Sequence, residues 1–186
     1  MKTLNLLGIG TALLTTLLTP KAMATDILFD PIETKHWQII NDNVMGGLSQ
    51  SRFYHEDNYG VFEGDVSLEN NGGFASIRRV ISPEFSDRSV IRLVVKGDGR
   101  KYQLRMKTHR LYEGAAYVAE FETDADTWQV ITFKEQDFTA RFRGRYITDA
   151  PKLKFGDAVT VGFLINDKRS GEFQLKVKAI EVLSST

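Results

Sequence analysis

The chain has 186 residues, in which 24 Lys and Arg balance 24 Asp and Glu, so its formal net charge is zero. A balanced charge gives no electrostatic reason to expect nucleic acid or anionic lipid as a partner. The chain contains no cysteine, which excludes structural disulfides and a lipoprotein anchor.

Residues 1–24 have the composition of a bacterial secretory signal peptide. Lys2 precedes an apolar run from Leu4 to Leu18, and small residues flank Met23, where a signal peptidase would act. We therefore expect residues 25–186 to form the mature protein, a single domain in the periplasm or secreted. No later stretch approaches the roughly 20 apolar residues that span a bilayer, so no transmembrane anchor is expected after cleavage.

Two turns with paired glycines stand at the start of the mature chain. They lie in the blocks Asp42–Ser49 and Asn70–Arg78, where Asn or Asp comes before two adjacent glycines and an alternating run. Such turns need the positive φ that glycine adopts readily, and the alternation after them is typical of strands. Between the two turns, residues 61–68 predict a half-buried strand with Phe62, Val66 and Leu68 on its apolar face.

Residues 90–96 and 101–107 predict two strands, and the Asp-Gly pair between them predicts a tight hairpin. In the second strand, Tyr102, Leu104 and Met106 alternate with polar residues. One face should therefore be core and the other a polar, arginine-bearing surface.

The rest of the chain continues this pattern. Residues 116–122 and 128–134 predict further strands, and residues 137–155 predict a long basic and aromatic loop of the kind that often binds ligands. Alternation over 159–165 and 173–177 predicts a terminal hairpin. Because apolar runs recur about every ten residues with no long helical period, the fold class is all-β, a sandwich or barrel.

A search for reactive groups finds no catalytic constellation. There is no cysteine, Ser49 lacks the glycine pattern of a nucleophile elbow, and the three histidines lack zinc-binding spacing. Asp124 and Asp126 begin a calcium-loop spacing that Trp128 interrupts. We therefore predict no catalytic residue, no metal site and no cofactor, although scattered oxygen ligands for a structural calcium leave no compact signature.

Arginines in patterned segments are the strongest candidates for a binding surface, because guanidinium groups match carboxylates, amides and sugar hydroxyls. Each could instead pair with an acidic neighbour across the sheet. The expected partner-binding or ligand-binding residues are Trp37, Asp42, Asn70, Asn71, Arg78, Tyr102, Arg105 and Arg145.

These motifs resemble the complex I intermediate-associated protein 30 family over nearly all of the mature chain. The residues that carry the resemblance are Trp37, Asp42–Ser49, Phe62 with Gly64, Asn71–Arg78, Gly97–Arg100 with Tyr102, Trp128, Phe142 with Gly144 and Arg145, and Asp167–Leu175.

The resemblance implies a galactose-binding-like jelly-roll β-sandwich and a binding module without established catalytic residues. Its mitochondrial members are assembly factors for respiratory complex I, so a protein partner, such as a membrane-complex assembly intermediate, is the first hypothesis. A carbohydrate-binding module is the second, because jelly rolls with aromatic and planar polar groups suit glycans. A hydrolase with a facing carboxylate pair is the third.

Overall fold

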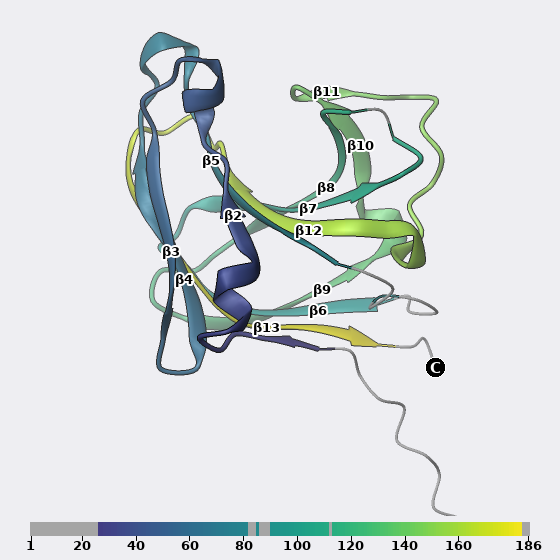
Figure 1. Cartoon of the computed structure of the whole chain (residues 1–186), viewed down its shortest axis with the longest axis horizontal. Coiled ribbons are helices and arrows are strands. Elements are labelled where there is room, and N and C mark those ends of the chain that lie inside the picture. The colour runs from purple at the N-terminus through teal and green to yellow at the C-terminus, as the bar shows by residue number, and fades with distance from the viewer. Residues whose placement is uncertain (1–25, 82–84, 86–89, 112, 184–186) are drawn as a thin grey trace, which may run out of the picture.

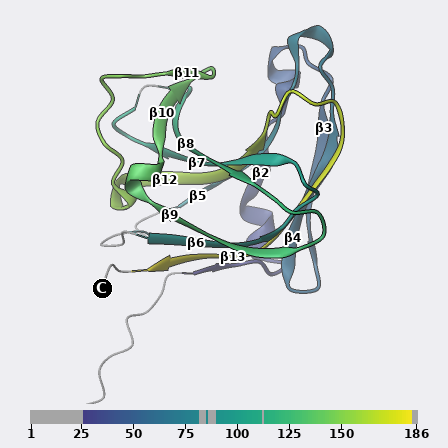
Figure 2. The same ribbon diagram turned by 180° about the vertical axis from the view of Figure 1, so that it is seen from behind.

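A computed structural model of the chain describes residues 26–81, 85, 90–111 and 113–183. Two antiparallel sheets pack face to face with the hydrophobic core between them, which is the predicted all-β sandwich (Figures 1 and 2). The predicted signal peptide lies outside the described residues. Among the described residues, no helix is long and apolar enough to cross a membrane.

The first sheet has six strands. Its order is β3-β4-β13-β6-β9, and β1 pairs with β13 at one side. The strands are β1 (Ile27–Leu28), β3 (Gln50–Glu56), β4 (Tyr59–Val66), β6 (Val90–Lys96), β9 (Trp128–Lys134) and β13 (Gly171–Leu183).

The second sheet has seven strands in the order β11-β10-β8-β7-β12-β5-β2. They are β2 (Trp37–Ile39), β5 (Ala75–Val80), β7 (Lys101–Thr108), β8 (Ala115–Glu122), β10 (Thr139–Phe142), β11 (Arg145–Tyr146) and β12 (Ala158–Ile165). Short 3-10 turns connect some of the strands: η1 (Glu33–His36), η2 (Asp42–Met45), η3 (Glu69–Asn71), η4 (Glu135–Asp137) and η5 (Phe155–Asp157).

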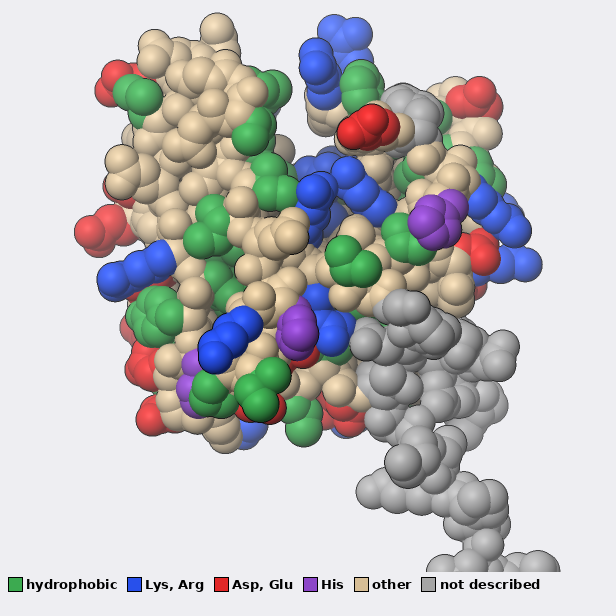
Figure 3. All heavy atoms as spheres, in the orientation of Figure 1, with side chains coloured by type: hydrophobic (Ala, Val, Ile, Leu, Met, Phe, Trp, Pro, Cys, Tyr) green, Lys and Arg blue, Asp and Glu red, His purple; other side chains and the backbone are tan. Residues whose placement is uncertain are grey.

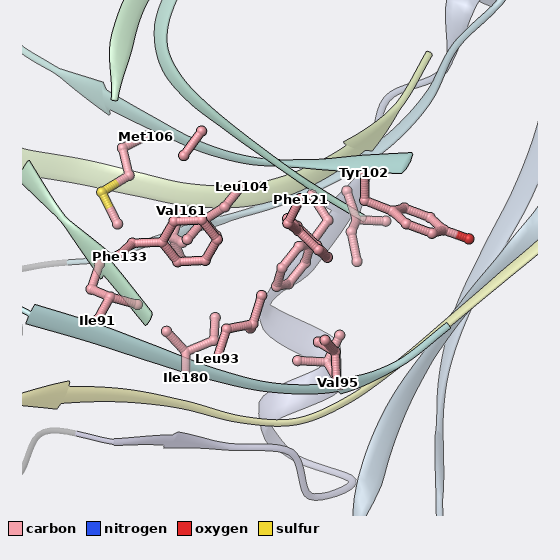
Figure 4. Packing of buried hydrophobic residues seen from close by; sticks show 14 of the residues in the cluster. Ile91, Leu93, Val95, Tyr102, Leu104, Met106, Phe121, Phe133, Val161 and Ile180 are labelled. Atoms are coloured by element: carbon pink, nitrogen blue, oxygen red, sulfur yellow. The ribbon is translucent and has the colours of Figure 1, made fainter. Parts of the chain in front are cut away.

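The core forms because alternate residues of both sheets point inward. Leu104 and Met106 of β7 face Ile91 and Leu93 of β6 across the sandwich, as Figure 4 shows, and all four side chains are fully buried. The predicted apolar face of residues 101–107 is therefore confirmed, and the polar residues between them point away from the core.

Both predicted hairpins are wrong. β6 and β7 belong to different sheets, and so do β12 and β13, so the turns after Lys96 and Ile165 carry the chain across the sandwich. The connection from β8 to β9 also crosses. The crossing from β8 to β9 lies beside the crossing from β6 to β7, since Asp126 N donates to Gly97 O at 2.9 Å and Thr123 Oγ1 donates to Arg100 O at 3.0 Å.

Arg100 joins these crossings through its guanidinium. The group donates to the Asp167 carboxylate at 2.6 and 3.0 Å, and to the carbonyls of Arg169, Gly171 and Glu172. The Arg100 and Asp167 side chains are only 5% and 7% exposed. The Asp-Gly turn between β6 and β7 therefore places Arg100 against the turn between β12 and β13, and it does not close a hairpin.

The predicted loop over residues 137–155 is more ordered than expected. It contains β10 and β11, which extend the seven-stranded sheet, and its Phe138 and Phe155 are buried in the core. The alternation in these strands spans too few residues to be visible in the sequence.

The glycine pairs take positive φ at one residue each. Gly46 has φ +92° and Gly73 has φ +125°, whereas Gly72 has φ −69°. The positive φ expected of the second turn is therefore taken by Gly73 and not by Gly72. Gly72 is glycine for another reason, since a Cβ there would lie 2.7 Å from Asp42 Oδ2.

We expect Arg100→Ala to lower the free energy of unfolding by about 3–5 kcal/mol, because it leaves the buried Asp167 carboxylate without its partner. Arg92→Ala is the matched control, since the Arg92–Glu181 pair is 47% and 22% exposed and should contribute less than about 1 kcal/mol. Urea unfolding followed by circular dichroism measures both. Equal losses in the two variants would contradict the role assigned to Arg100.

Candidate functional site

Buried Asp42 joins the two glycine-paired turns. Its carboxylate accepts hydrogen bonds from Ser49 N at 2.9 Å, Ser49 Oγ at 2.5 Å, Gly73 N at 2.7 Å and Phe74 N at 3.1 Å. The first two donors follow the Gly46-Gly47 pair, and the other two belong to the Gly72-Gly73 turn. One carboxylate therefore fixes both turns beside the start of β5.

Ionised Asp42 is favoured despite its burial. Burial acts to raise its pKa, but the hydrogen bonds from Ser49, Gly73 and Phe74 outweigh that effect and lower the pKa below its ordinary value of 3.8. The charge is therefore balanced by donors within the fold.

Three of the expected binding residues do not lie on the surface. Asp42 and Tyr102 are fully buried, and Trp37 is 7% exposed. Trp37 packs against Phe163 and donates from Nε1 to Glu33, while the Tyr102 hydroxyl donates to Asp98 at 3.0 Å. The expectation that these residues line an outward surface is wrong, because neighbouring strands cover the aromatic rings and the turns enclose Asp42.

The outward face of the seven-stranded sheet is concave, and we call it the concave face. The sheet curls so that the turns beside β2 rise on one side and β10 and β11 rise on the other (Figure 1). In the space-filling view this face is a hollow with Lys and Arg side chains gathered on its floor (Figure 3). The molecule is thus hollowed where its cationic groups concentrate.

Arg78 and Arg105 come together on this face. Their strand neighbours Ile77 and Leu104 point into the core, so the two arginines point outward. Strand pairing then places them in a single row across six strands, which runs Gln38, Arg78, Gly162, Arg105, Val118, Thr139. The sequence predicted both residues, but only the pairing of β5, β12 and β7 makes them neighbours.

Neither arginine has an acidic partner. Arg78 and Arg105 are half-buried, yet they make no hydrogen bond or ion pair with any residue that the structure describes. Other arginines of the described chain do have acidic partners. Arg52, Arg92 and Arg141 form ion pairs across a sheet, and Arg79, Arg100 and Arg110 form ion pairs with carboxylates in turns.

Lys107 adds a third positive charge to the concave face. Burial lowers its pKa, and the charges of Arg78 and Arg105 lower it further. Burial also lowers the pKa of Arg105, with a smaller contribution from Arg141. Such mutual effects require the cationic groups to lie close together, because the interaction between charges falls off with distance.

β10 and β11 form one wall of the hollow. Arg141 is paired with Glu120 at 2.7 Å, and its guanidinium lies 4.7 Å from the ring centroid of Tyr146. Glu120 also accepts a weaker contact from Gln103 at 3.4 Å. The Glu120 carboxylate of the neighbouring β8 is therefore already neutralised by Arg141.

The other expected residues are exposed but lie elsewhere. Arg145 precedes Tyr146 in β11 and so points to the opposite face of the sheet. Asn70 and Asn71 have φ of +53° and +58° in the turn η3, where they shape the chain before β5. None of the three joins the row of Arg78 and Arg105.

Acidic side chains gather instead in a surface depression beside β4 and β13. Of the carboxylates there, Glu63 is held by Arg52 and Gln174, and Asp98 accepts from Tyr102 and Gln174 N. Among the described residues, no group of three or more His, Asp or Glu could hold a metal ion. The concave face, by contrast, offers hydrogen-bond donors and positive charge.

Sequence reasoning missed Lys107, Arg141 and Tyr146 as members of the site. Lys107 shares a strand face with Arg105 at a spacing of two, so it belongs to the polar surface predicted for residues 101–107. Arg141 and Tyr146 fall in the segment 137–155 that was predicted as a loop able to bind ligands, but their strands of four and two residues are too short to show which face each residue occupies.

Comparison with family models places most of the chain in one family. A model described as complex I intermediate-associated protein 30 matches residues 27–177, which is most of the chain. Comparison with curated protein sequences gave no match.

Solved structures share the fold at low sequence identity. The family 11 carbohydrate-binding module from Clostridium thermocellum, solved with a β-1,3-1,4-mixed-linked tetrasaccharide, is 14% identical with a TM-score of 0.59, over 86% of this chain and 96% of that one. The family 11 module of the cellulosomal cellulase Lic26A-Cel5E from the same organism is 14% identical with a TM-score of 0.58, over 81% and 88%. The agarase AgWH50C is 8% identical with a TM-score of 0.56, over 82% of this chain and 24% of that one. These likenesses show that the β-sandwich fold of this chain is shared with solved proteins.

Asp42→Asn should lower the free energy of unfolding at neutral pH by about 1.5–3 kcal/mol, the usual contribution of hydrogen bonds to a charged group. Because the folded pKa of Asp42 is lowered, this contribution is complete above the ordinary value of 3.8 and is lost as the pH falls through the folded pKa. The two proteins should therefore converge in stability at low pH. Urea unfolding from about pH 7 down to about pH 2.5 measures this, with the exposed Asp65→Asn as a control for the lost charge. A constant gap across the pH range would refute the assignment.

Proposed function

We propose that this chain, which belongs to the complex I intermediate-associated protein 30 family, is a binding module that holds an extended ligand on its concave face and does not transform it. One observation carries the proposal: two half-buried arginines, Arg78 and Arg105, flank Gly162 and have no acidic partner among the residues that the structure describes. Groups that have lost part of their hydration without gaining a partner within the fold are available to a ligand.

The shape of the face favours a linear polymer as the ligand. The hollow lies between two walls, and the row from Gln38 to Thr139 crosses its floor from β2 to β10. Guanidinium, amide and hydroxyl groups along this row can bond to the hydroxyls and ring oxygens of a sugar chain. A solved sandwich of the same fold was determined with a tetrasaccharide, so this architecture has served glycan binding in another protein. We therefore propose a glycan as the ligand.

A protein partner is the second candidate. It is favoured by the family itself, whose description is of a protein associated with intermediates of complex I. It is also favoured by the exposed Tyr146 beside Arg145, since Tyr and Arg are enriched at protein interfaces. With the predicted secretory signal, such a partner would be met in the periplasm or outside the cell.

The test is binding of the mature chain to a panel of bacterial, algal and plant glycans, followed by isothermal titration calorimetry of the best ligand. We expect Arg78→Ala combined with Arg105→Ala to weaken binding at least tenfold without loss of the circular dichroism signal. The matched control is Arg52→Ala combined with Arg92→Ala, which removes two equally charged residues from the other sheet.

Two results would contradict the glycan proposal. One is the absence of binding to any glycan of the panel. The other is equal loss of affinity in the two double variants, which would place the ligand away from the concave face.

A further inference from the structure

The concave face has more positively charged side chains than ion pairs within the fold. The face carries Arg78, Arg105, Lys107 and Arg141. Among the described residues, Arg141 forms an ion pair with Glu120, and Glu113 acts on Lys107 through its charge without forming an ion pair with it. The whole chain has no positive excess to place on a surface, because its acidic and basic residues are equal in number. The positive charge gathered on this face is therefore offset by acidic residues elsewhere in the chain.

We propose that the ligand of the concave face is an acidic glycan, and that a uronate carboxylate sits over Gly162 between the guanidinium groups of Arg78 and Arg105. This inference rests on the proposed function and names the class of its ligand. A planar carboxylate suits the position because a guanidinium fork can bind it through two parallel hydrogen bonds.

Gly162 leaves the space that such a carboxylate needs. It pairs with Arg78 on one side and with Arg105 on the other. Since paired residues of neighbouring strands lie about 5 Å apart, the two arginine Cα atoms are about 10 Å apart, within reach of one shared anion. A Cβ on Gly162 would lie 2.4 Å from Ile77 O and 3.0 Å from Arg78 Cβ, so only glycine keeps this part of the floor free of side chains.

An anion would also relieve an unfavourable arrangement of charges. Lys107 and the two arginines repel one another in a partly desolvated place, where Coulomb interactions are stronger than in water. A bound carboxylate would be attracted to all three groups. A neutral sugar would leave the repulsion in place.

A neutral glycan fits the face less well for a second reason. Neutral sugars are commonly held on exposed aromatic rings, whose apolar surfaces match the faces of the sugar ring. The rings of Trp37 and Tyr102 are buried in the core. Tyr146 is exposed, but its ring lies under the guanidinium of Arg141.

The experiment compares three probes by calorimetry: an oligogalacturonate, the same oligomer with its carboxylates methyl-esterified, and dextran sulfate. We expect the wild-type chain to bind the oligogalacturonate at least tenfold more tightly than the ester. Arg105→Ala and Arg78→Ala should each weaken that binding about tenfold, Arg105→Lys less, and the Arg52→Ala plus Arg92→Ala control not at all. In nuclear magnetic resonance spectra, the amide signal of Gly162 should shift with the oligogalacturonate.

The outcomes separate the two proposals. Equal binding of the acid and the ester would overturn the acidic-glycan inference and leave the glycan-binding function standing. Dextran sulfate binding as tightly as the oligogalacturonate would show a general polyanion surface and also overturn it. No binding of any glycan, here or in the wider panel, would overturn the proposed function on which the inference rests.

Discussion

The hydrogen bonds to the Asp42 carboxylate are the constraint on which the rest of the structure depends. They join segments about thirty residues apart in the chain, since Ser49 follows the first glycine pair and Gly73 belongs to the second. Gly47 and Gly72 leave room for the Asp42 side chain. A Cβ on Gly47 would lie 2.4 Å from Asp42 Cγ, and one on Gly72 would lie 2.7 Å from Asp42 Oδ2. Two motifs that look separate in the sequence are thus one structural unit.

This unit determines where the arginines stand. Asp42 N donates to Phe74 O and Ile40 N donates to Ser76 O, so the turn that Asp42 organises also holds the start of β5. β5 then pairs with β12, and β12 with β7, in the register that aligns Arg78 with Gly162 and Arg105. A shift of one residue in β5 would turn Arg78 into the core, because side chains alternate along a strand. Buried Asp42 therefore supports the concave face without being part of it.

The sequence predicted the strands well and their connections poorly, and the reason is physical. Alternation is a local property, so residues 90–96 and 101–107 were assigned correctly from their own pattern. Whether a turn closes a hairpin or crosses a sandwich depends on distant partners, here the contacts of Arg100 with Asp167 and its neighbours. The same limit applies to Trp37 and Tyr102, since an aromatic ring on a strand is equally compatible with a binding platform and with the core.

Arg100 and Arg105 differ in whether the fold supplies partners for their charges. Arg100 and Arg105 are five residues apart, and both are at least partly buried, yet one has five acceptors and the other has none among the described residues. The stability of the fold accounts for Arg100, whose charge is paired. It does not account for Arg105, because partial burial of an unpaired charge is unfavourable. A position that departs from the rules of stable folding while its neighbours obey them is where a functional requirement is expected. The row Arg78, Gly162 and Arg105 across β5, β12 and β7 is such a position. It places two positive charges beside a glycine without a side chain, and this chemistry specifies an anionic ligand group more directly than the shape of the sandwich does.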